Sequence, residues 1–435
     1  MDFFTALALL QEQVPFSVLL AIALGLALIY YGAFRGRVHH LFDPLGWVLA
    51  FSCVTLILLF VLQLQDLVPL SKALWTVSVL VVFYGSFLLF SGMDQRRGGR
   101  TAETELPPMR APGSAALLIL LAVNTTLWLA TYVFFGIPLF LDSRLEQFAQ
   151  GGGVGLLSRL TSGLDFICLM MGMLSLRLGG RPRALGYMLV LESIVNALLS
   201  GSKSGLISLV FGYYLVEVGL QRRWNVRLRL SAGKLLLVSL IFMSPLAVLA
   251  TKGGDGSTGV VEQLFTRVAA EGDGYVMFYA NDLIDDLARF DPLALLRPLL
   301  VTFRLAPLET MVNPGYEVIT AVLGIDSPTT GPNARLPVFL YFFYGWGGIL
   351  LAVPLGAGLY LARRAVHHST GRTALRFSFV CSIYVLCTKL EVDPQLTVNG
   401  LVNLLIVTPI LGLVLLSEMP RPRQTPQATM PGEAR

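Results

Sequence analysis

The stretch VPFSVLLAIALGLALIYYGAF, residues 14–34, contains no charged side chain and is almost entirely apolar. A helix of about 20 such residues crosses the roughly 30 Å hydrocarbon core of a bilayer. No basic segment precedes this run and no small-residue cleavage site follows it. We therefore expect a retained membrane span and not a removable signal peptide.

The composition of the whole chain agrees with this local pattern. Of 435 residues, 55% are hydrophobic and only 14% are charged, and the mean hydropathy is +0.70. Soluble domains carry about 25% charged residues. Because only helices satisfy their own backbone groups in lipid without closing a barrel, we predict an all-α polytopic membrane protein. Its spans, about eleven in number, are expected at 14–33, 44–65, 72–91, 114–134, 159–177, 185–200, 205–220, 234–250, 336–362, 373–390 and 397–417.

Lysine and arginine residues mark one side of the membrane, because they fall in alternate connections between the predicted spans. The positive-inside rule assigns these connections to the cytoplasm, with the N-terminus outside and the C-terminus inside. Outside then lie a loop at about 135–158, the turn around Lys203 and a segment at about 251–335. Residues 1–417 form one predicted transmembrane domain, and the polar, proline-rich residues 418–435 predict a disordered cytoplasmic tail.

The external segment at 251–335 is too long for a plain connection, and loops of such length are usually functional. Its apolar stretches VVEQLFTRVAA (260–270) and PLALLRPLLVTFRLAP (292–307) predict short amphipathic helices at the membrane surface. The formal net charge of +5 is concentrated on the cytoplasmic side. That distribution indicates contact with anionic lipid and argues against a nucleic-acid partner.

Several cations lie on the predicted external face, where membrane insertion does not require them. Lys203 is surrounded by small residues in ALLSGSKSGLISLV (197–210), which would let backbone amides approach an anion closely. The spacing does not fit a nucleotide P-loop. The alternative is a hairpin turn whose lysine extends to the interface. The external cations are Arg144, Arg159, Lys203, Lys252, Arg267, Arg289, Arg297, Arg304 and Arg335.

Histidine and cysteine chemistry is not expected at an external site. The four histidines, His39, His40, His367 and His368, all fall in predicted cytoplasmic loops. An external site would therefore lack a histidine base or metal ligand. The four cysteines, Cys53, Cys168, Cys381 and Cys387, lie in apolar runs at no metal-ligand spacing and are expected to be buried hydrophobic residues.

Carboxylates supply the remaining candidates. Asp165 and Glu192 lie inside predicted spans, where an ionisable group is a functional candidate, although a helix-to-helix ion pair or hydrogen bond explains it equally well. Outside, the spacing of Asp282, Asp285 and Asp286 does not match a calcium loop and fits a solvated helix face.

Three stretches resemble the O-antigen or oligosaccharide repeat-unit polymerases, the Wzy-type family of bacterial envelopes. They are FFGIPLFLDSRLEQFAQGGGVG (134–155), LSGSKSGLI (199–207) and NPGYEVITAVLGIDSPTTGPNARLPVFLYFFYGWGGILLAVPLGAG (313–358). An Arg-x10-Gly pattern known from some relatives fits Arg144 with Gly155 and Arg304 with Gly315. Lys203 stands where the family usually has arginine.

This resemblance implies a glycosyltransferase of the GT-C type in the bacterial inner membrane. Its substrates would be undecaprenyl-pyrophosphate-linked oligosaccharides, joined on the periplasmic side, with a chain-length regulator as a potential protein partner. Fixed cations would stabilise the departing pyrophosphate, and we assign this role to Arg144, Lys203, Arg304 and Arg335. Neither a metal nor a cofactor is expected.

A carboxylate is also needed to orient or deprotonate the acceptor hydroxyl. Glu271, four residues after Arg267, is our choice for the catalytic pair, and Glu309 and Glu317 are its competitors.

Two other functions are compatible with the sequence. An O-antigen ligase would have the same architecture, but a functional histidine is expected in its large external loop, and residues 251–335 contain none. A lipid-oligosaccharide flippase or a small-solute transporter would not be an enzyme. That class predicts inverted repeats, broken helices and polar groups at the bilayer midplane.

The arginine distribution generates a topology prediction. Single cysteines near Gly98 and near Gly254, each in a cysteine-free background, should differ in labelling by a membrane-impermeant thiol reagent. In intact spheroplasts, the cysteine near Gly254 should be labelled and the one near Gly98 protected. The reverse pattern would overturn the predicted orientation.

Overall fold

The computed structural model describes residues 16–40, 42–98, 109–140, 154–179, 182–200, 203–226, 273–280, 282–324, 332–370 and 372–418. All regular structure within these residues is helical, apart from an isolated bridge between Arg110 and Thr373. The predicted all-α class is therefore confirmed.

Five helical segments of the described chain are long and apolar enough to cross a membrane. They are Pro44–Leu64, Leu70–Asp94, Ser114–Phe140, Gly155–Leu178 and Leu336–Ser369. A sixth span results if Pro394–Ile406 and Thr408–Ser417, which meet at a bend of 44°, are counted as one. The chain is thus a multi-pass membrane protein with five or six candidate spans.

These spans correspond to named helices. They are α3 (Pro44–Leu64), α4 (Leu70–Gly98), α5 (Ser114–Phe135) with η1 (Pro138–Phe140), α7 (Val154–Leu178), α16 (Leu336–Tyr344) with η4 (Gly345–Gly348) and α17 (Ile349–Ser369), and α19 (Pro394–Ile406) with α20 (Thr408–Glu418).

Helices also occur at the other predicted spans that the structure describes, but they are shorter. They are α2 (Phe16–Phe34), α8 (Arg183–Leu199), α9 (Lys203–Gln221) and α18 (Ala374–Thr388). The apolar part of α2 begins at Leu20, and α18 has only 15 residues. The predicted span 234–250 lies outside the described residues. A total of eleven spans therefore remains a prediction.

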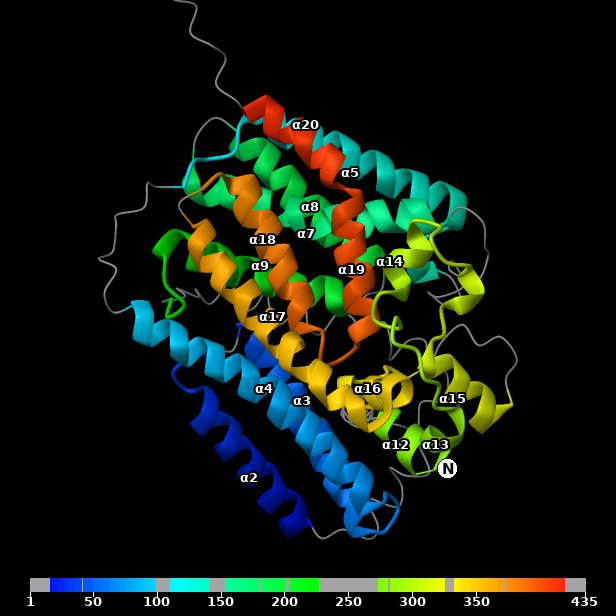
Figure 1. Cartoon of the computed structure of the whole chain (residues 1–435). Helices are drawn as coiled ribbons and strands as arrows, with labels where there is room; N and C mark the ends of the chain where they lie inside the picture. Colours follow the sequence, from blue (N-terminus) through cyan, green and yellow to red (C-terminus); the bar gives the residue numbers. More distant parts are fainter. Residues whose placement is uncertain are drawn as a thin grey trace, which may run out of the picture.

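Short helices occupy the described part of the predicted external segment. They are α12 (Asp273–Tyr279), α13 (Leu283–Leu287), α14 (Arg297–Thr302), η3 (Leu308–Thr310) and α15 (Pro314–Leu323). Figure 1 shows α12, α13 and α15 gathered beside α16, with α14 beside α19. The stretch 292–307 thus contains a short helix, as predicted, whereas 260–270 lies outside the described residues.

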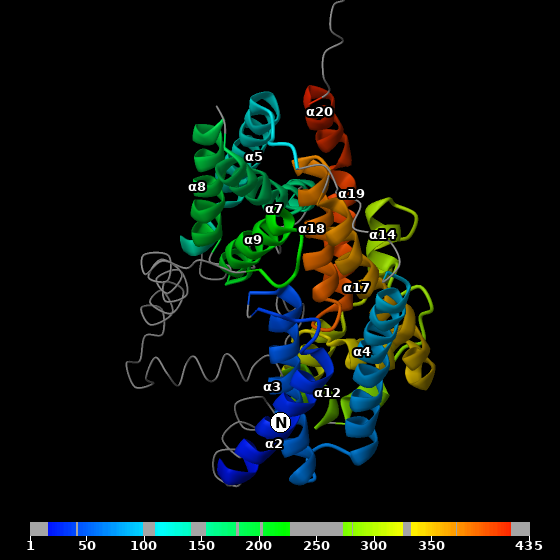
Figure 2. The same cartoon turned by 90° about the vertical axis from the view of Figure 1, so that its left-hand side faces the viewer.

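The long helices form two groups that α18 connects (Figures 1 and 2). In one group α17 runs along α4, and in the other α7 contacts α5, α8, α9 and α19. The helices approach closely where side chains are small: a Cβ atom added at Gly356 would collide with the carbonyl oxygen of Phe83. Close backbone approach of this kind is how helices associate in lipid, where hydrophobic burial supplies little driving force.

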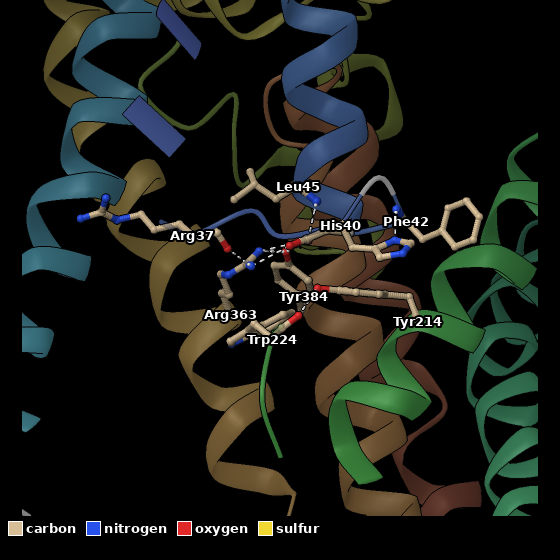
Figure 3. Close-up of polar contacts among 9 residues, drawn as sticks. Arg37, His40, Phe42, Leu45, Tyr214, Trp224, Arg363 and Tyr384 are labelled. Carbon is tan, nitrogen blue, oxygen red and sulfur yellow. Dashed lines mark hydrogen bonds and ion pairs between the residues drawn. The ribbon is translucent and has the colours of Figure 1, made fainter. Parts of the chain in front are cut away.

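A buried network ties one end of these groups together (Figure 3). Arg363 donates to both carboxylate oxygens of Asp43, at 2.6 and 3.0 Å, and to the backbone oxygen of Arg37 at 2.7 Å. The hydroxyl of Tyr384 donates to Asp43 at 2.8 Å, and the Arg363 guanidinium lies 3.9 Å from the centre of the Trp224 ring. The network therefore joins α17, α18 and the start of α3.

Arg363 was predicted to follow a span as a loop residue, but the structure extends α17 through it and buries it. The ion pair makes that burial tolerable, because the desolvation of a guanidinium is offset by a bidentate carboxylate. Asp43 has a second role, since it caps α3 by accepting from the Leu45 amide at 3.1 Å.

This network generates a stability prediction. Replacing Arg363 by leucine leaves Asp43 buried without its cation and should destabilise the protein by about 3–5 kcal/mol. Arg364→Leu is the matched control, because Arg364 pairs with Asp94 in a half-exposed site and should contribute less than about 1 kcal/mol. Thermal unfolding of the purified protein in detergent measures both. Equal losses in the two variants would contradict a structural role for the network.

Candidate functional site

The candidate site lies where the predicted external segment meets the turn between α18 and α19. α12 contacts α15 and α16, and α14 contacts α19. The side chain of Gln395, at the start of α19, donates to the backbone oxygen of Val312 at 3.2 Å. Contacts between distant parts of the chain therefore build this end of the molecule.

A buried ion pair forms the centre of this region. Arg335 and Glu391 are both 0% exposed, and Arg335 Nη1 donates to Glu391 Oε1 at 2.5 Å. The Leu336 amide also donates to the backbone oxygen of Glu391 at 2.9 Å. The pair thereby fixes the turn that follows α18 against the start of α16. Removing one partner of such a pair leaves an uncompensated buried charge.

Tyrosines from three helices surround the ion pair. Tyr30 of α2, Tyr84 of α4 and Tyr275 of α12 all lie within electrostatic range of Arg335 and Glu391. The buried hydroxyls of Tyr84 and Tyr275 have no hydrogen-bond partner among the described residues. The interior of this end is thus polar although it is enclosed.

The turn after α18 carries two further charged groups. Burial lowers the pKa of Lys389. Burial also raises the pKa of Asp393 to about 6, against the opposing effect of its hydrogen bond from the Leu396 amide at 2.8 Å. Both groups are therefore held in an environment that disfavours their charged forms.

A surface depression of about 260 Å³ lies between residues 285–290, from α13 onward, and residues 341–345 at the end of α16. Aromatic and charged side chains line it, including Tyr341, Tyr344, Phe290, Arg289 and Asp285. Partial burial alone would raise the pKa of Asp285, but hydrogen bonds from Lys72 at 2.6 Å and Tyr341 at 2.7 Å hold it below its ordinary value. Arg289 pairs with Glu317 at 2.7 Å. The depression therefore combines aromatic faces with charged groups at its edge, a lining that suits polar, ring-shaped ligands.

Arg304 lies at the end of α14 in a left-handed conformation, with φ 57°. The Leu305 amide donates to Leu300 and the Arg304 amide to Val301, at 2.8 and 3.0 Å, which is the hydrogen-bond pattern of a Schellman C-cap. Glycine is the residue preferred at this position. The chain instead exposes an arginine there, between two exposed apolar side chains, Phe303 and Leu305.

Residues 290–308, which include Arg304, carry six exposed apolar side chains, which we call the apolar rim. Leu305 is 73% exposed and Phe290 is 82% exposed, and the other members are Leu293, Leu296, Phe303 and Leu308. α14, which carries part of this rim, lies against α19 of the bent candidate span. The apolar rim therefore lies partly beside a candidate membrane span, and the guanidinium of Arg304 belongs to the same stretch of chain.

The structure describes only some of the residues predicted for the site. Arg144, Arg267 and Glu271 lie outside the described residues, and Lys203 begins α9 without a described side chain. Arg304 is exposed at the rim, whereas Arg335 is enclosed with Glu391 and not open to solvent. Of the competing acids, Glu309 is exposed, and Glu317 is paired with Arg289. Arg304 and Arg335 thus occupy different parts of the same end.

Lys389, Glu391 and Asp393 were missed from the sequence. A signal was present, because TKLEVDP (388–394) places three charged residues between two apolar runs. The burial of Glu391 against Arg335, 56 residues away along the chain, could not be predicted without the tertiary structure.

Comparison with known proteins supplies no relative: no family profile, no curated protein and no solved structure matches the chain.

Asp393 generates a pH prediction. Because its pKa is raised in the folded protein, the folded state holds this proton more tightly, and the resulting stabilisation is lost as the pH rises through about 6. One pKa unit corresponds to about 1.4 kcal/mol, so the loss between about pH 4 and about pH 7 should reach about 3 kcal/mol.

The variant Asp393→Asn separates this effect from those of other groups. Asparagine caps helices as well as aspartate does, so the variant should keep α19 but lose this part of the pH dependence. Unfolding temperatures of both proteins across this pH range provide the measurement. Identical pH profiles would show that Asp393 does not titrate abnormally.

Proposed function

We propose that the protein is a glycosyltransferase that joins lipid-pyrophosphate-linked oligosaccharide units, as a polymerase of O-antigen or a related surface polysaccharide. The observation that carries this proposal is Arg304, an exposed cation within an apolar rim beside a candidate membrane span. A lipid pyrophosphate has the matching chemistry, because an anionic headgroup is attached to a long apolar chain.

The position of Arg304 in the backbone supports a functional role. A side chain at a left-handed C-cap position costs about 1 kcal/mol relative to glycine. Residues that keep such conformations are enriched at functional sites. A guanidinium at this point offers a bidentate contact to a phosphate, so the rim gains an anion-binding group where folding alone favours glycine.

The neighbouring depression suits the sugar portion of the substrate. Tyr341 and Tyr344 provide aromatic surfaces, while Asp285 and Arg289 provide hydrogen-bonding groups at the edge. Arg335 supports this arrangement indirectly, since its pair with Glu391 holds the turn after α18. Lys203 and Arg144 are the further cations that we expect to approach the pyrophosphate.

The reaction requires one substitution at carbon. A hydroxyl oxygen of one lipid-linked unit attacks the anomeric carbon of the growing glycan, and the bond from that carbon to the pyrophosphate oxygen breaks. The electron pair leaves with the lipid pyrophosphate, whose charge the cations stabilise. The hydroxyl proton passes to a carboxylate, for which Glu271 is our choice and the exposed Glu309 the described alternative.

A lipid-oligosaccharide flippase is the second candidate, and one observation favours it. Transporters use broken membrane helices, and α19 and α20 meet at a 44° bend. Proteoliposomes distinguish the two functions. The proposed polymerase elongates glycans without an ion gradient, whereas a flippase moves the lipid-linked unit across the bilayer and leaves its length unchanged.

Substitutions at Arg304 test the proposal. A charge-assisted hydrogen bond contributes about 1.5–3 kcal/mol, so Arg304→Ala should slow elongation by roughly 10- to 150-fold. Arg304→Lys should also be impaired, because one ammonium cannot replace a guanidinium fork. Elongation of a purified undecaprenyl-pyrophosphate-linked repeat unit by the protein in nanodiscs provides the measurement, with product lengths resolved on a gel.

Two variants serve as controls for folding and for general charge. Arg304→Gly relieves the left-handed strain, so its stability should stay within about 1 kcal/mol of the original while elongation is lost. Arg376→Ala removes an exposed arginine at the start of α18, whereas Glu391 follows the end of that helix. This variant should remain fully active. Full elongation by Arg304→Gly would remove Arg304 from the site.

A further inference from the structure

A second group of polar side chains lies inside the helix bundle, between α5, α7 and α8. Trp128 of α5 donates its indole N–H to Asp165 of α7 at 2.8 Å. Tyr132 of α5 donates to the side-chain oxygen of Asn196 of α8 at 3.0 Å. Glu192 of α8 faces Asn124 and Thr125 of α5 and lies within electrostatic range of Asp165. The three helices thus share a polar contact within an apolar bundle.

The spacing of these residues makes the contact continuous. Asn124, Trp128 and Tyr132 recur every four residues along α5, and Glu192, Asn196 and Ser200 do the same from α8 into its C-cap. Residues four apart lie on one helix face. Each helix therefore carries a polar stripe, that of α8 ends at its C-cap Ser200, and the hydrogen bond from Tyr132 to Asn196 joins the two stripes.

Neither Asp165 nor Glu192 forms an ion pair with a cation of the described residues. All ion pairs among these residues involve other carboxylates. The other titratable groups in range are Tyr132 of α5 and Cys168 of α7. α9 packs against α7 and α8, and its Glu217 is paired with Arg177. α19 also contacts α7, and its Asn403 accepts a hydrogen bond from Arg159.

The buried side-chain amide of Asn124 indicates that this polar contact lacks a hydrogen-bond donor. Asn124 is 0% exposed, and neither its side-chain oxygen nor its nitrogen makes a well-formed hydrogen bond among the described residues, although Glu192 lies next to it. Both Glu192 oxygens are also buried without a well-formed hydrogen bond. An ionised carboxylate only accepts hydrogen bonds, whereas a protonated one also donates through its O–H. Adding a proton to Glu192 therefore supplies the donor that the amide oxygen lacks.

We propose that Asp165 and Glu192 form a proton-binding site within the membrane, with Asn124 as its hydrogen-bonding partner. Two carboxylates within electrostatic range of each other, in an apolar bundle, do not both ionise near neutral pH. At least one of them carries a proton, and the stripe through Tyr132 and Asn196 connects that proton to the end of α8. The site is separate from the region around Arg304 and Arg335.

A hydrophobic carbodiimide tests this site, because it reacts with protonated carboxyls in apolar surroundings. The purified protein in nanodiscs is treated with dicyclohexylcarbodiimide at pH 7, and labelled peptides are quantified by mass spectrometry. Glu192 or Asp165 should be labelled at least about tenfold more than Glu217, the ratio that one pKa unit between carboxyls produces. Glu217 is the internal control, since it is also enclosed in the bundle, at 4% exposure, but is paired with Arg177 at 2.5 Å.

A second readout does not depend on access of the reagent. Infrared difference spectra between pH 7 and pH 10 should show the C=O band of a protonated carboxyl, and this band should be lost in the double variant Asp165→Asn, Glu192→Gln. Absence of the band in the unsubstituted protein would overturn the proposal, whatever the labelling. If sodium but not potassium protected the acids from labelling, the site would bind a sodium ion and not a proton. That result would also overturn the proposal.

Discussion

The fold depends on one constraint: a charge enclosed in an apolar helix bundle must be neutralised by another part of the same bundle. The protein meets this constraint in two ways. Asp43 with Arg363, and Glu391 with Arg335, are ion pairs between segments far apart in the chain, and each pair fixes the start of a helix. Asp165 and Glu192 have amides, an indole and each other as neighbours. The first arrangement holds helices in place, whereas the second leaves room for an exchangeable proton.

The sequence predicted the fold class because hydropathy is a local property. Runs such as Pro44–Leu64 and Ser114–Phe135 are apolar along their whole length, and their helices begin where capping residues or prolines allow. The prediction fails where a helix extends beyond its apolar run. Arg363 and His367 were predicted to lie in a loop, yet α17 continues through both. Asp43, the N-cap of α3, neutralises the arginine, and the hydroxyl of Tyr384 in α18 accepts a hydrogen bond from it. The sequence around Arg363 gives no indication that Asp43 is its partner.

The candidate site was predictable in part for the same reason. Arg304 and Arg335 were identified because they are positive charges on the predicted external side, but the same criterion could not distinguish an exposed cation from an enclosed one. That difference is set by Glu391, which a turn after α18 delivers to Arg335. In contrast, Asp165 and Glu192 were identified by their position within apolar runs, and only the helix packing brings them within electrostatic range of each other and places Glu192 against Asn124.

The two regions place different demands on their surroundings. A cation that receives a phosphate must stay accessible, and Arg304 achieves this on a short helix at the rim, where few contacts constrain it. A carboxyl that retains a proton must be shielded from water and from cations, and Asp165 and Glu192 lie between three packed helices, α5, α7 and α8. The polar stripe of α8 ends at Ser200, three residues before α9 begins. Protonation of the acid pair removes negative charge from the bundle, so protonation of these acids and binding of an anion by a cation of the site are expected to favour each other.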